Sequence, residues 1–143
     1  MLGLETLSLR VRHEAESTAK LAEFFRANKN VKKVSYVGFE DDASYALAQK
    51  YFRKGAACVI SVEMKGTLES TVKLVEGLKL VANMTMIGDS ITVVTHPAST
   101  THKQLSEEAL ERAGISPTLL RISAGLEAVE DIIEDFEQAF ANI

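Results

Sequence analysis

The sequence predicts an α/β (α+β) fold: a mainly antiparallel sheet of four to five strands, with helices on one face and a long helix leading into it. Two observations give this prediction. The first 28 residues carry apolar side chains at the three-to-four spacing of an amphipathic helix. The rest of the chain alternates between short β-branched runs and segments of helical periodicity. At 143 residues, 46% of them hydrophobic, the chain can bury the core of a single domain, which we expect to span residues 1–143.

The lead-in helix is predicted over residues 1–28 and ends in the polar stretch "ANKN". Its apolar stripe consists of Leu4, Leu7, Val11, Ala15, Ala22 and Phe25. The first two turns also carry Leu2 and Leu9, which is more apolar surface than one face needs. This excess predicts a second packing partner, and a homo-oligomer through this helix would supply one. A frayed end that folds back is the alternative.

A strand and a short helix are predicted to follow. "KKVSYVGF" at 32–39 alternates between apolar and polar residues, as a half-buried strand does. Residues 41–55 have helical spacing, with Asp42 as a cap and Gly55 as a stop after a basic last turn.

The next strand and helix have stronger signals. "ACVISVEM" at 57–64 is rich in β-branched residues and continuous enough for a central strand. Residues 67–81 return to helical spacing behind Thr67, a good cap residue. The side chains expected to face inward are those of Leu68, Val72 and Val75.

Two short strands are then predicted at 84–88 ("MTMIG") and 91–96 ("ITVVTH"), separated by the turn-forming group Gly88-Asp89-Ser90. The stretch "LSEEALERAG" at 105–114 has the punctuation of a helix, with Ser106 as its cap.

The chain closes with one strand and one helix. Pro117 precedes "LLRIS" at 119–123, a strand, and residues 125–140 form the last helix. Its apolar stripe consists of Leu126, Val129, Ile132, Ile133, Phe136 and Phe140. Its acidic residues are expected on the opposite, solvated face.

Composition excludes several classes of protein. The net charge is −4 and there is no basic block, so we expect no nucleic-acid partner. No apolar run is long enough to span a membrane, and the first residues do not resemble a signal peptide, so we expect a cytoplasmic protein. The single cysteine, Cys58, cannot form an internal disulfide and lies in an apolar run typical of a core position.

Common catalytic motifs are absent from the sequence, which has no glycine-rich phosphate loop and no GxSxG elbow. The stretch "HPASTTH" contains His96 and His102, but their spacing does not match a metal site and no cysteine lies nearby. A serine triad through Ser99 would need a general base and a buried acid, and the residue pattern indicates neither.

Arg121 does not fit a purely structural interpretation. On a strand it points to the face opposite Leu120 and Ile122. If that face is solvated, Arg121 is an ordinary surface charge. If the face is partly buried, the guanidinium needs an anion, and its planar donors suit a carboxylate. The residue pattern leaves both interpretations open.

Three stretches carry a resemblance to a known family: "GLETLSLR" at 3–10, "GDSITVVTHPASTTH" at 88–102 and "AGISPTLLRISAGLEAVEDIIEDFEQAF" at 113–140. In order, and across the whole chain, they resemble the C-terminal part of the pyridoxal-phosphate-dependent Cys/Met metabolism enzymes. That family includes cystathionine γ-synthase, cystathionine lyases, methionine γ-lyase and O-acetylhomoserine sulfhydrylase. The "GD" turn and "HPASTTH" are most similar to the O-acetylhomoserine sulfhydrylase branch.

The resemblance implies the C-terminal small domain of a fold-type I pyridoxal-phosphate enzyme, with the long helix crossing from a large domain. It implies that Arg121 binds the substrate α-carboxylate, with Met86 and Ile87 as further substrate-binding positions. It also places a loop near the substrate channel for positioning and packing; that loop contains His96, Pro97, Ser99 and Thr100.

Two departures from the family limit what this chain can do. No lysine corresponds to the family's Schiff-base lysine, and the other cofactor-binding elements also have no counterpart. Met86 stands where many members have Ser or Asn, so the grip on the carboxylate would be weaker or rely on backbone groups. We therefore expect a chain without a cofactor of its own, inactive alone, whose partners are an N-terminal pyridoxal-phosphate-binding large domain and a small amino-acid substrate.

The implied reaction of the parent enzyme converts O-acetylhomoserine and sulfide or a thiol into homocysteine or methionine and acetate. Two alternatives stay open: a non-catalytic binding or dimerisation module derived from this domain, and an independent enzyme that uses His96 or Cys58. The sequence does not distinguish an excised domain, a truncated gene product or half of a split enzyme, and it does not give the thiol or sulfide preference.

Overall fold

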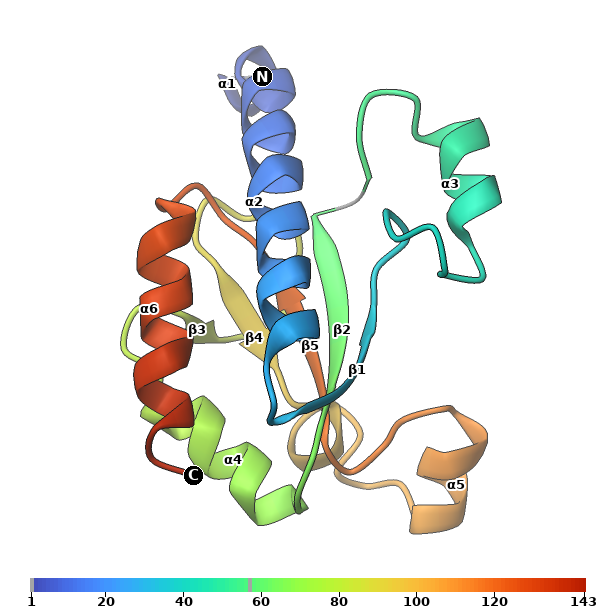
Figure 1. Ribbon diagram of the computed structural model, residues 1–143, viewed down its shortest axis with the longest axis vertical. Coiled ribbons are helices and arrows are strands. Elements are labelled where there is room, and N and C mark those ends of the chain that lie inside the picture. Colours follow the sequence, from blue (N-terminus) through green and yellow to red (C-terminus); the bar gives the residue numbers. More distant parts are fainter. Residues whose placement is uncertain (1, 57) are drawn as a thin grey trace.

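The computed structural model describes residues 2–56 and 58–143 (Figure 1). The elements are α1 (Leu2–Glu5), α2 (Leu7–Ala27), β1 (Val31–Ser35), α3 (Tyr45–Tyr51), β2 (Val59–Met64), α4 (Leu68–Gly77), β3 (Ala82–Asn83), β4 (Val93–Thr95), the 3₁₀ turn η1 (Pro97–Ser99), α5 (Glu107–Arg112), β5 (Leu119–Ser123) and α6 (Val129–Phe140). The predicted alternation of helices and strands is confirmed apart from the strand expected at 84–88, and the long lead-in helix is divided at Thr6.

The five strands form one sheet in the order β1-β2-β5-β4-β3. Neighbouring strands are antiparallel except for the short β3–β4 pair, which is parallel, so the mainly antiparallel sheet is confirmed. β2, predicted to be central, is an interior strand between β1 and β5.

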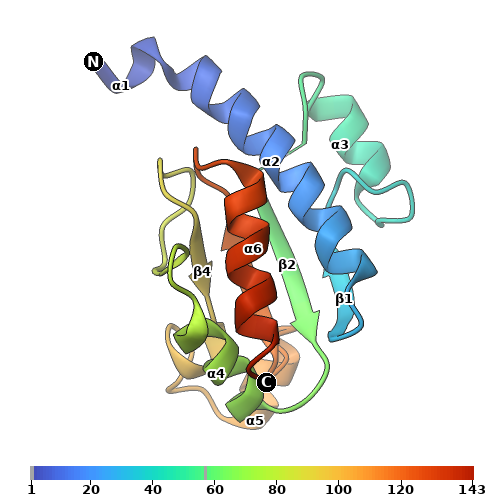
Figure 2. The ribbon, with the colours of Figure 1, turned by 60° about the vertical axis from the view of Figure 1, so that its left-hand side comes forward.

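Helices α2 and α6 cover one face of this sheet, and α4 packs against α6 (Figures 1 and 2). Because side chains alternate along a strand, Ile60, Leu120 and Ile122 point toward these helices and are buried. The rings of Phe25 and Phe136 meet edge to face, with centroids 4.8 Å apart, and join α2 to α6. Helices α3 and α5 lie to the side of the sheet, so no helix of the described residues covers its second face (Figure 1).

Two predicted caps are confirmed. Thr67 Oγ1 accepts the backbone N–H of Ser70, and the Ser70 hydroxyl accepts the backbone N–H of Thr67, which is a complete capping box at the start of α4. Ser106 Oγ accepts the backbone N–H of Ala109 at the start of α5.

Most predicted elements are shorter in the structure: the strand expected at 32–39 ends at Ser35, the helix expected at 67–81 ends at Gly77, and the helix expected at 125–140 begins at Val129. Two predictions differ more. Residues 84–88 form no strand, because the chain leaves the sheet after β3 and exposes Met84, Met86 and Ile87. The helix predicted at 41–55 is confined to α3, and Asp42 does not cap it. Asp42 Oδ1 instead accepts the N–H of Ser44 inside the preceding turn.

The predicted faces of two helices also need correction. In α4, Leu74 and Val75 are buried, whereas Leu68 is exposed at the first position and Val72 is only half-buried. In α6, one acidic residue of the expected solvated face, Asp135, is buried. Its carboxylate receives the backbone N–H groups of residues 79–81, which need an acceptor there.

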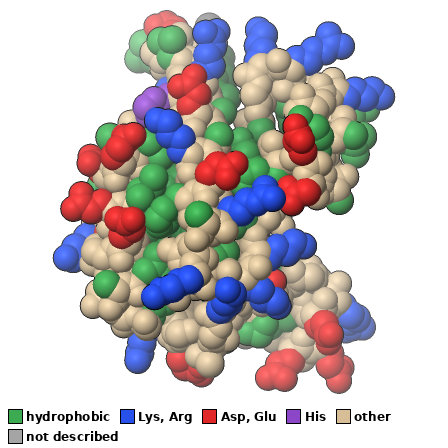
Figure 3. Space-filling view, in the orientation of Figure 1, with side chains coloured by type: hydrophobic (Ala, Val, Ile, Leu, Met, Phe, Trp, Pro, Cys, Tyr) green, Lys and Arg blue, Asp and Glu red, His purple; other side chains and the backbone are tan. Residues whose placement is uncertain are grey.

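The apolar excess at the start of the chain lies on the surface. The exposed fractions of Leu2, Leu4 and Leu9 are 81%, 68% and 67%. This end of the helix projects beyond the sheet (Figure 2). On the face that carries α2 and α6, Lys and Arg side chains are interspersed with Asp and Glu, and there is no continuous basic surface (Figure 3). In the part of the chain that is described, no helix combines the length and apolar character that a membrane crossing requires.

Candidate functional site

Arg121 lies on the sheet face that the helices leave uncovered. Its neighbours Leu120 and Ile122 point into the core, and Arg121 itself is half-buried. In the strand ladders it stands between Ser61 of β2 and Thr95 of β4. The sequence left its environment open, and the structure gives an intermediate answer: a guanidinium in a partly sheltered position on the open face.

The guanidinium is held at one nitrogen only. Arg121 Nη2 donates to the backbone carbonyl of Thr85 at 2.8 Å and to Thr95 Oγ1 at 3.4 Å. Among the described residues, Nη1 and Nε donate to no protein acceptor, and Arg121 forms no ion pair. An arginine with free parallel donors and no carboxylate of its own can bind an external carboxylate.

The segment from residue 84 to residue 90 lies beside this guanidinium. Thr95 Oγ1 donates to the Met84 carbonyl, and the backbone N–H of Gly88 donates to Ser123 Oγ at 3.0 Å. Between these two ties, the side chains of Met86 and Ile87 are 49% and 56% exposed. Within the described chain their backbone N–H groups have no protein acceptor, so Met86 and Ile87 offer backbone donors and apolar side chains just after Thr85, whose carbonyl receives Arg121 Nη2.

The loop after β4 is fixed by His96, which is buried. Its Nε2 lies 2.8 Å from the Pro117 carbonyl and its Nδ1 lies 2.7 Å from Ser99 Oγ. Because a carbonyl can only accept, Nε2 must carry the proton of that bond. Thr100 Oγ1 also donates to the His96 carbonyl at 2.8 Å.

These contacts occupy both ring nitrogens of His96. Pro97 and Ser99 begin and end η1, which packs against β5, the strand that carries Arg121. No cluster of three or more metal-ligating side chains occurs among residues 2–56 and 58–143. The loop therefore has the contacts of a packing element next to β5.

Sequence reasoning missed a buried acidic residue, Glu14, which lies outside the predicted apolar stripe of the lead-in helix and is 1% exposed. Burial raises the pKa of its carboxyl, and the nearby Arg10 guanidinium and Cys58 thiol only partly offset this effect. Its Oε2 has no hydrogen-bond partner among the described residues. Glu14 is an internal acid on the lead-in helix, and no motif points to it.

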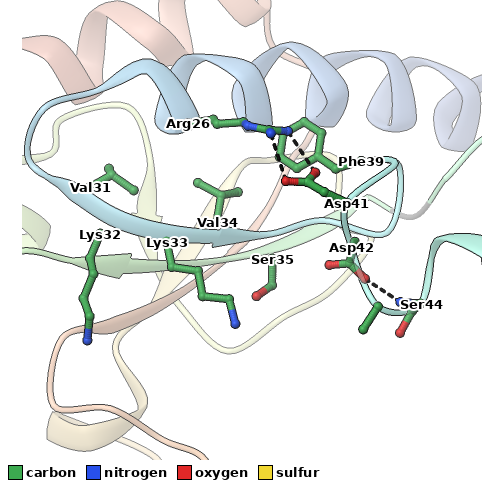
Figure 4. A pocket seen from close by; sticks show the side chains of 11 residues that line it. Arg26, Val31, Lys32, Lys33, Val34, Ser35, Phe39, Asp41, Asp42 and Ser44 are labelled. Atoms are coloured by element: carbon green, nitrogen blue, oxygen red, sulfur yellow. Dashed lines mark hydrogen bonds and ion pairs between the residues drawn. The ribbon is translucent and has the colours of Figure 1, made fainter.

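A hollow of about 610 Å³ lies elsewhere, between the end of α2, β1 and the turn before α3 (Figure 4). Arg26 closes one side of it, pairing with Asp41 at 2.9 Å and stacking on the Phe39 ring at 4.5 Å. None of the site residues expected from the sequence lines this hollow. It is a structural recess at the edge of the sheet.

The described residues do not fit the cofactor that the resemblance assigns to the parent enzyme. A Schiff base to pyridoxal phosphate needs a lysine in a sheltered site. All ten lysines of the chain are exposed. Lys32, which lines the hollow, is paired with Glu63 at 2.9 Å. The described part of the chain therefore offers no sheltered lysine for such a bond.

Comparison with known proteins identifies the relatives of the chain. Residues 1–141 match the family described as Cys/Met metabolism PLP-dependent enzyme. A sulfhydrylase of Fusarium oxysporum f. sp. lycopersici is 44% identical over 140 residues, which are 98% of this chain and 32% of that protein. The O-acetyl-L-homoserine sulfhydrylase of Corynebacterium glutamicum is 40% identical over 141 residues, 99% of this chain and 32% of that protein.

A solved structure gives the same result for the fold. A crystal structure from Campylobacter jejuni, assigned as an O-acetylhomoserine (thiol)-lyase and containing a pyridoxyl-lysine monophosphate, superposes with a TM-score of 0.90 at 36% identity. The match covers 98% of this chain and 33% of that one. The chain thus spans about a third of the length of the relatives it matches.

Proposed function

Because the chain belongs to the family of Cys/Met metabolism PLP-dependent enzymes, we propose that it is the C-terminal, substrate-anchoring domain of an O-acetylhomoserine sulfhydrylase. In this proposal the parent enzyme converts O-acetylhomoserine and sulfide or a thiol into homocysteine or methionine and acetate. The chain supplies the anchor for the substrate α-carboxylate and is inactive alone.

One observation carries the proposal: Arg121 has free donors and no carboxylate partner among the described residues, on a sheet face without helices. An α-carboxylate would bind in two parallel hydrogen bonds to the guanidinium. The backbone N–H groups of Met86 and Ile87 are available to the same ligand. They replace the polar side chain that Met86 does not offer, and the exposed apolar side chains exclude water around the carboxylate.

The chemistry on the amino acid is assigned to the rest of the parent enzyme, where pyridoxal phosphate would supply the electron sink. The lysines of this chain are all exposed, which supports assigning the imine chemistry to the rest of the parent enzyme. The uncovered sheet face and the exposed leucines of the lead-in helix are proposed to pack against that missing large domain.

The exposed leucines also favour a second candidate, a dimerisation module that pairs through the lead-in helix. Sedimentation equilibrium separates the two. A dimer lost on Leu4→Ser with Leu9→Ser supports the module. A monomer that binds the separately produced large domain supports the anchor domain.

The decisive experiment replaces the matching third of the Corynebacterium glutamicum enzyme with this chain and measures homocysteine formation from O-acetylhomoserine and sulfide. Arg121→Lys keeps the positive charge but loses the two parallel donors of the guanidinium. We therefore expect kcat/KM to fall roughly 100-fold, mainly through a higher KM. Arg112→Lys, an exposed arginine at the end of α5, is the control. Equal kinetics for the two variants would refute the anchor role of Arg121.

A second measurement tests inactivity. The visible absorbance of the purified chain with added pyridoxal phosphate, before and after dialysis, should return to baseline. Retained imine absorbance traced to one lysine, such as Lys54 or Lys103, would contradict the proposal.

A further inference from the structure

Thr95 occupies the position directly opposite Arg121 in the β4–β5 ladder and is 2% exposed. Its O–H group donates to the Met84 carbonyl, and its oxygen accepts from Arg121 Nη2 at 3.4 Å. A hydroxyl has one proton, and a carbonyl can only accept, so the Met84 bond uses that proton. The lone pairs of Thr95 Oγ1 are thereby left for the guanidinium.

The second acceptor of Arg121 also depends on Thr95. The backbone N–H of Met84 donates to the Val94 carbonyl at 3.0 Å, so backbone and hydroxyl bonds together hold residue 84 beside β4. The next residue, Thr85, provides the carbonyl that receives Nη2 at 2.8 Å. Both contacts of the guanidinium thus depend on Thr95. One is made directly to Thr95 Oγ1, and the other is made to the Thr85 carbonyl, which Thr95 holds in place through Met84.

We propose that Thr95 is a positioning residue that holds Arg121 and the backbone at residues 84–87 as one unit for carboxylate recognition. This inference rests on the proposed function of Arg121. Without the hydroxyl, the long arginine side chain would have to be ordered by the ligand itself, which weakens binding. The same tie fixes the separation between the free guanidinium donors and the backbone N–H groups of Met86 and Ile87.

The test uses NMR on the 143-residue chain, labelled with ¹⁵N, with O-acetyl-L-homoserine as the carboxylate probe. Thr95→Val removes the hydroxyl and keeps the shape, and Thr95→Ser keeps the hydroxyl. Thr92→Val is the matched control, because Thr92 is an equally buried threonine just before β4 that bonds Glu127 and Gly125 instead of Arg121.

In the wild type, the Nη protons of Arg121 should give separate signals, and the Nε–H signal should shift saturably with the probe. Thr95→Val should merge the Nη signals and weaken the apparent affinity by about tenfold. Thr95→Ser and Thr92→Val should leave both readouts within about twofold of wild type, even if Thr92→Val lowers stability.

Each other outcome is informative. Unchanged Arg121 signals and affinity in Thr95→Val would overturn the positioning role while leaving carboxylate anchoring intact. The same loss in Thr92→Val would also overturn it, because a general loss of packing would then explain the effect. Ordered Arg121 signals with no Nε–H response to the probe in any variant would overturn carboxylate recognition, and the proposed function with it.

Discussion

Asp135 offers the sharpest test of how this structure holds the segment that leads into β3 and the candidate site. Its carboxylate lies on α6 and is 6% exposed. Oδ2 accepts the backbone N–H groups of Leu80 and Val81 at 2.9 Å, and Oδ1 accepts that of Lys79 at 2.9 Å. These residues lead directly into β3 and then into the 84–90 segment, so Asp135 holds the chain just before the candidate site.

We expect Asp135→Ala to lower the free energy of unfolding by about 3 kcal/mol. Hydrogen bonds to charged groups contribute about 1.5–3 kcal/mol each, but Lys79 and Leu80 are exposed, so water can replace their bonds. Val81 is buried, and its N–H would be left without a partner. Glu134→Gln, an exposed neighbour on the same helix, should change stability by less than about 0.5 kcal/mol.

Urea unfolding followed by circular dichroism measures this difference. Burial opposes ionisation of Asp135, but the backbone N–H groups and Gln138 outweigh it and hold the pKa below its usual range. A lowered folded-state pKa contributes stability above the unfolded pKa, about 4, and that stability is lost as the pH falls through the folded value. The difference in free energy of unfolding between the wild type and Asp135→Ala should therefore become smaller as the pH falls toward 2. A difference in free energy of unfolding below about 1 kcal/mol at pH 7, or one that does not change with pH, would refute the stabilising role of the Asp135 carboxylate.

Three further predictions use the same unfolding assay. Glu14→Gln should stabilise the chain increasingly above about pH 4.3, the unfolded pKa of a glutamate. The folded-state pKa of Glu14 is raised, so the wild type loses stability as the pH rises from the unfolded pKa through the folded one. His96→Ala should cost about 2–4 kcal/mol, since it empties a buried site and leaves the Pro117 carbonyl without its donor. Thr67→Ala should cost about 1 kcal/mol, because the N–H of Ser70 loses its cap.

Each of these has a matched control. Glu16→Gln alters an exposed carboxylate two residues from Glu14 and should show no comparable pH dependence. His102→Ala changes a half-buried histidine of the same stretch and should cost less than about 1 kcal/mol. Ser8→Ala, on the exposed start of α2, should be nearly neutral beside Thr67→Ala. If a control variant changed the free energy of unfolding as much as its paired variant does, the physical reason given for that variant would be wrong.

Sequence periodicity predicted most of the order of elements, the mainly antiparallel sheet and the strand that carries Arg121. These features follow from local rules: β-branched runs extend, a three-to-four spacing forms helices, and Thr67 and Ser106 cap them. The alternation around Arg121 also fixed which sheet face it occupies. The family of the chain could likewise be inferred from its motifs.

Other features depended on contacts between residues far apart in sequence. The strand predicted at 84–88 failed because a short apolar run extends only if a neighbouring strand accepts its hydrogen bonds, and the sheet ends at β3. Asp135 looked like a surface acid, because its partners lie more than fifty residues away. Glu14 is buried only because the helix packs on β2.

The candidate site divides in the same way. The sequence supplied Arg121 and the loop that begins with His96, since each stands out within its own segment. Only the tertiary structure placed Thr95 beneath the guanidinium and the Thr85 carbonyl within 2.8 Å of it. A guanidinium is oriented by acceptors from other strands, and strand register decides which residues those are.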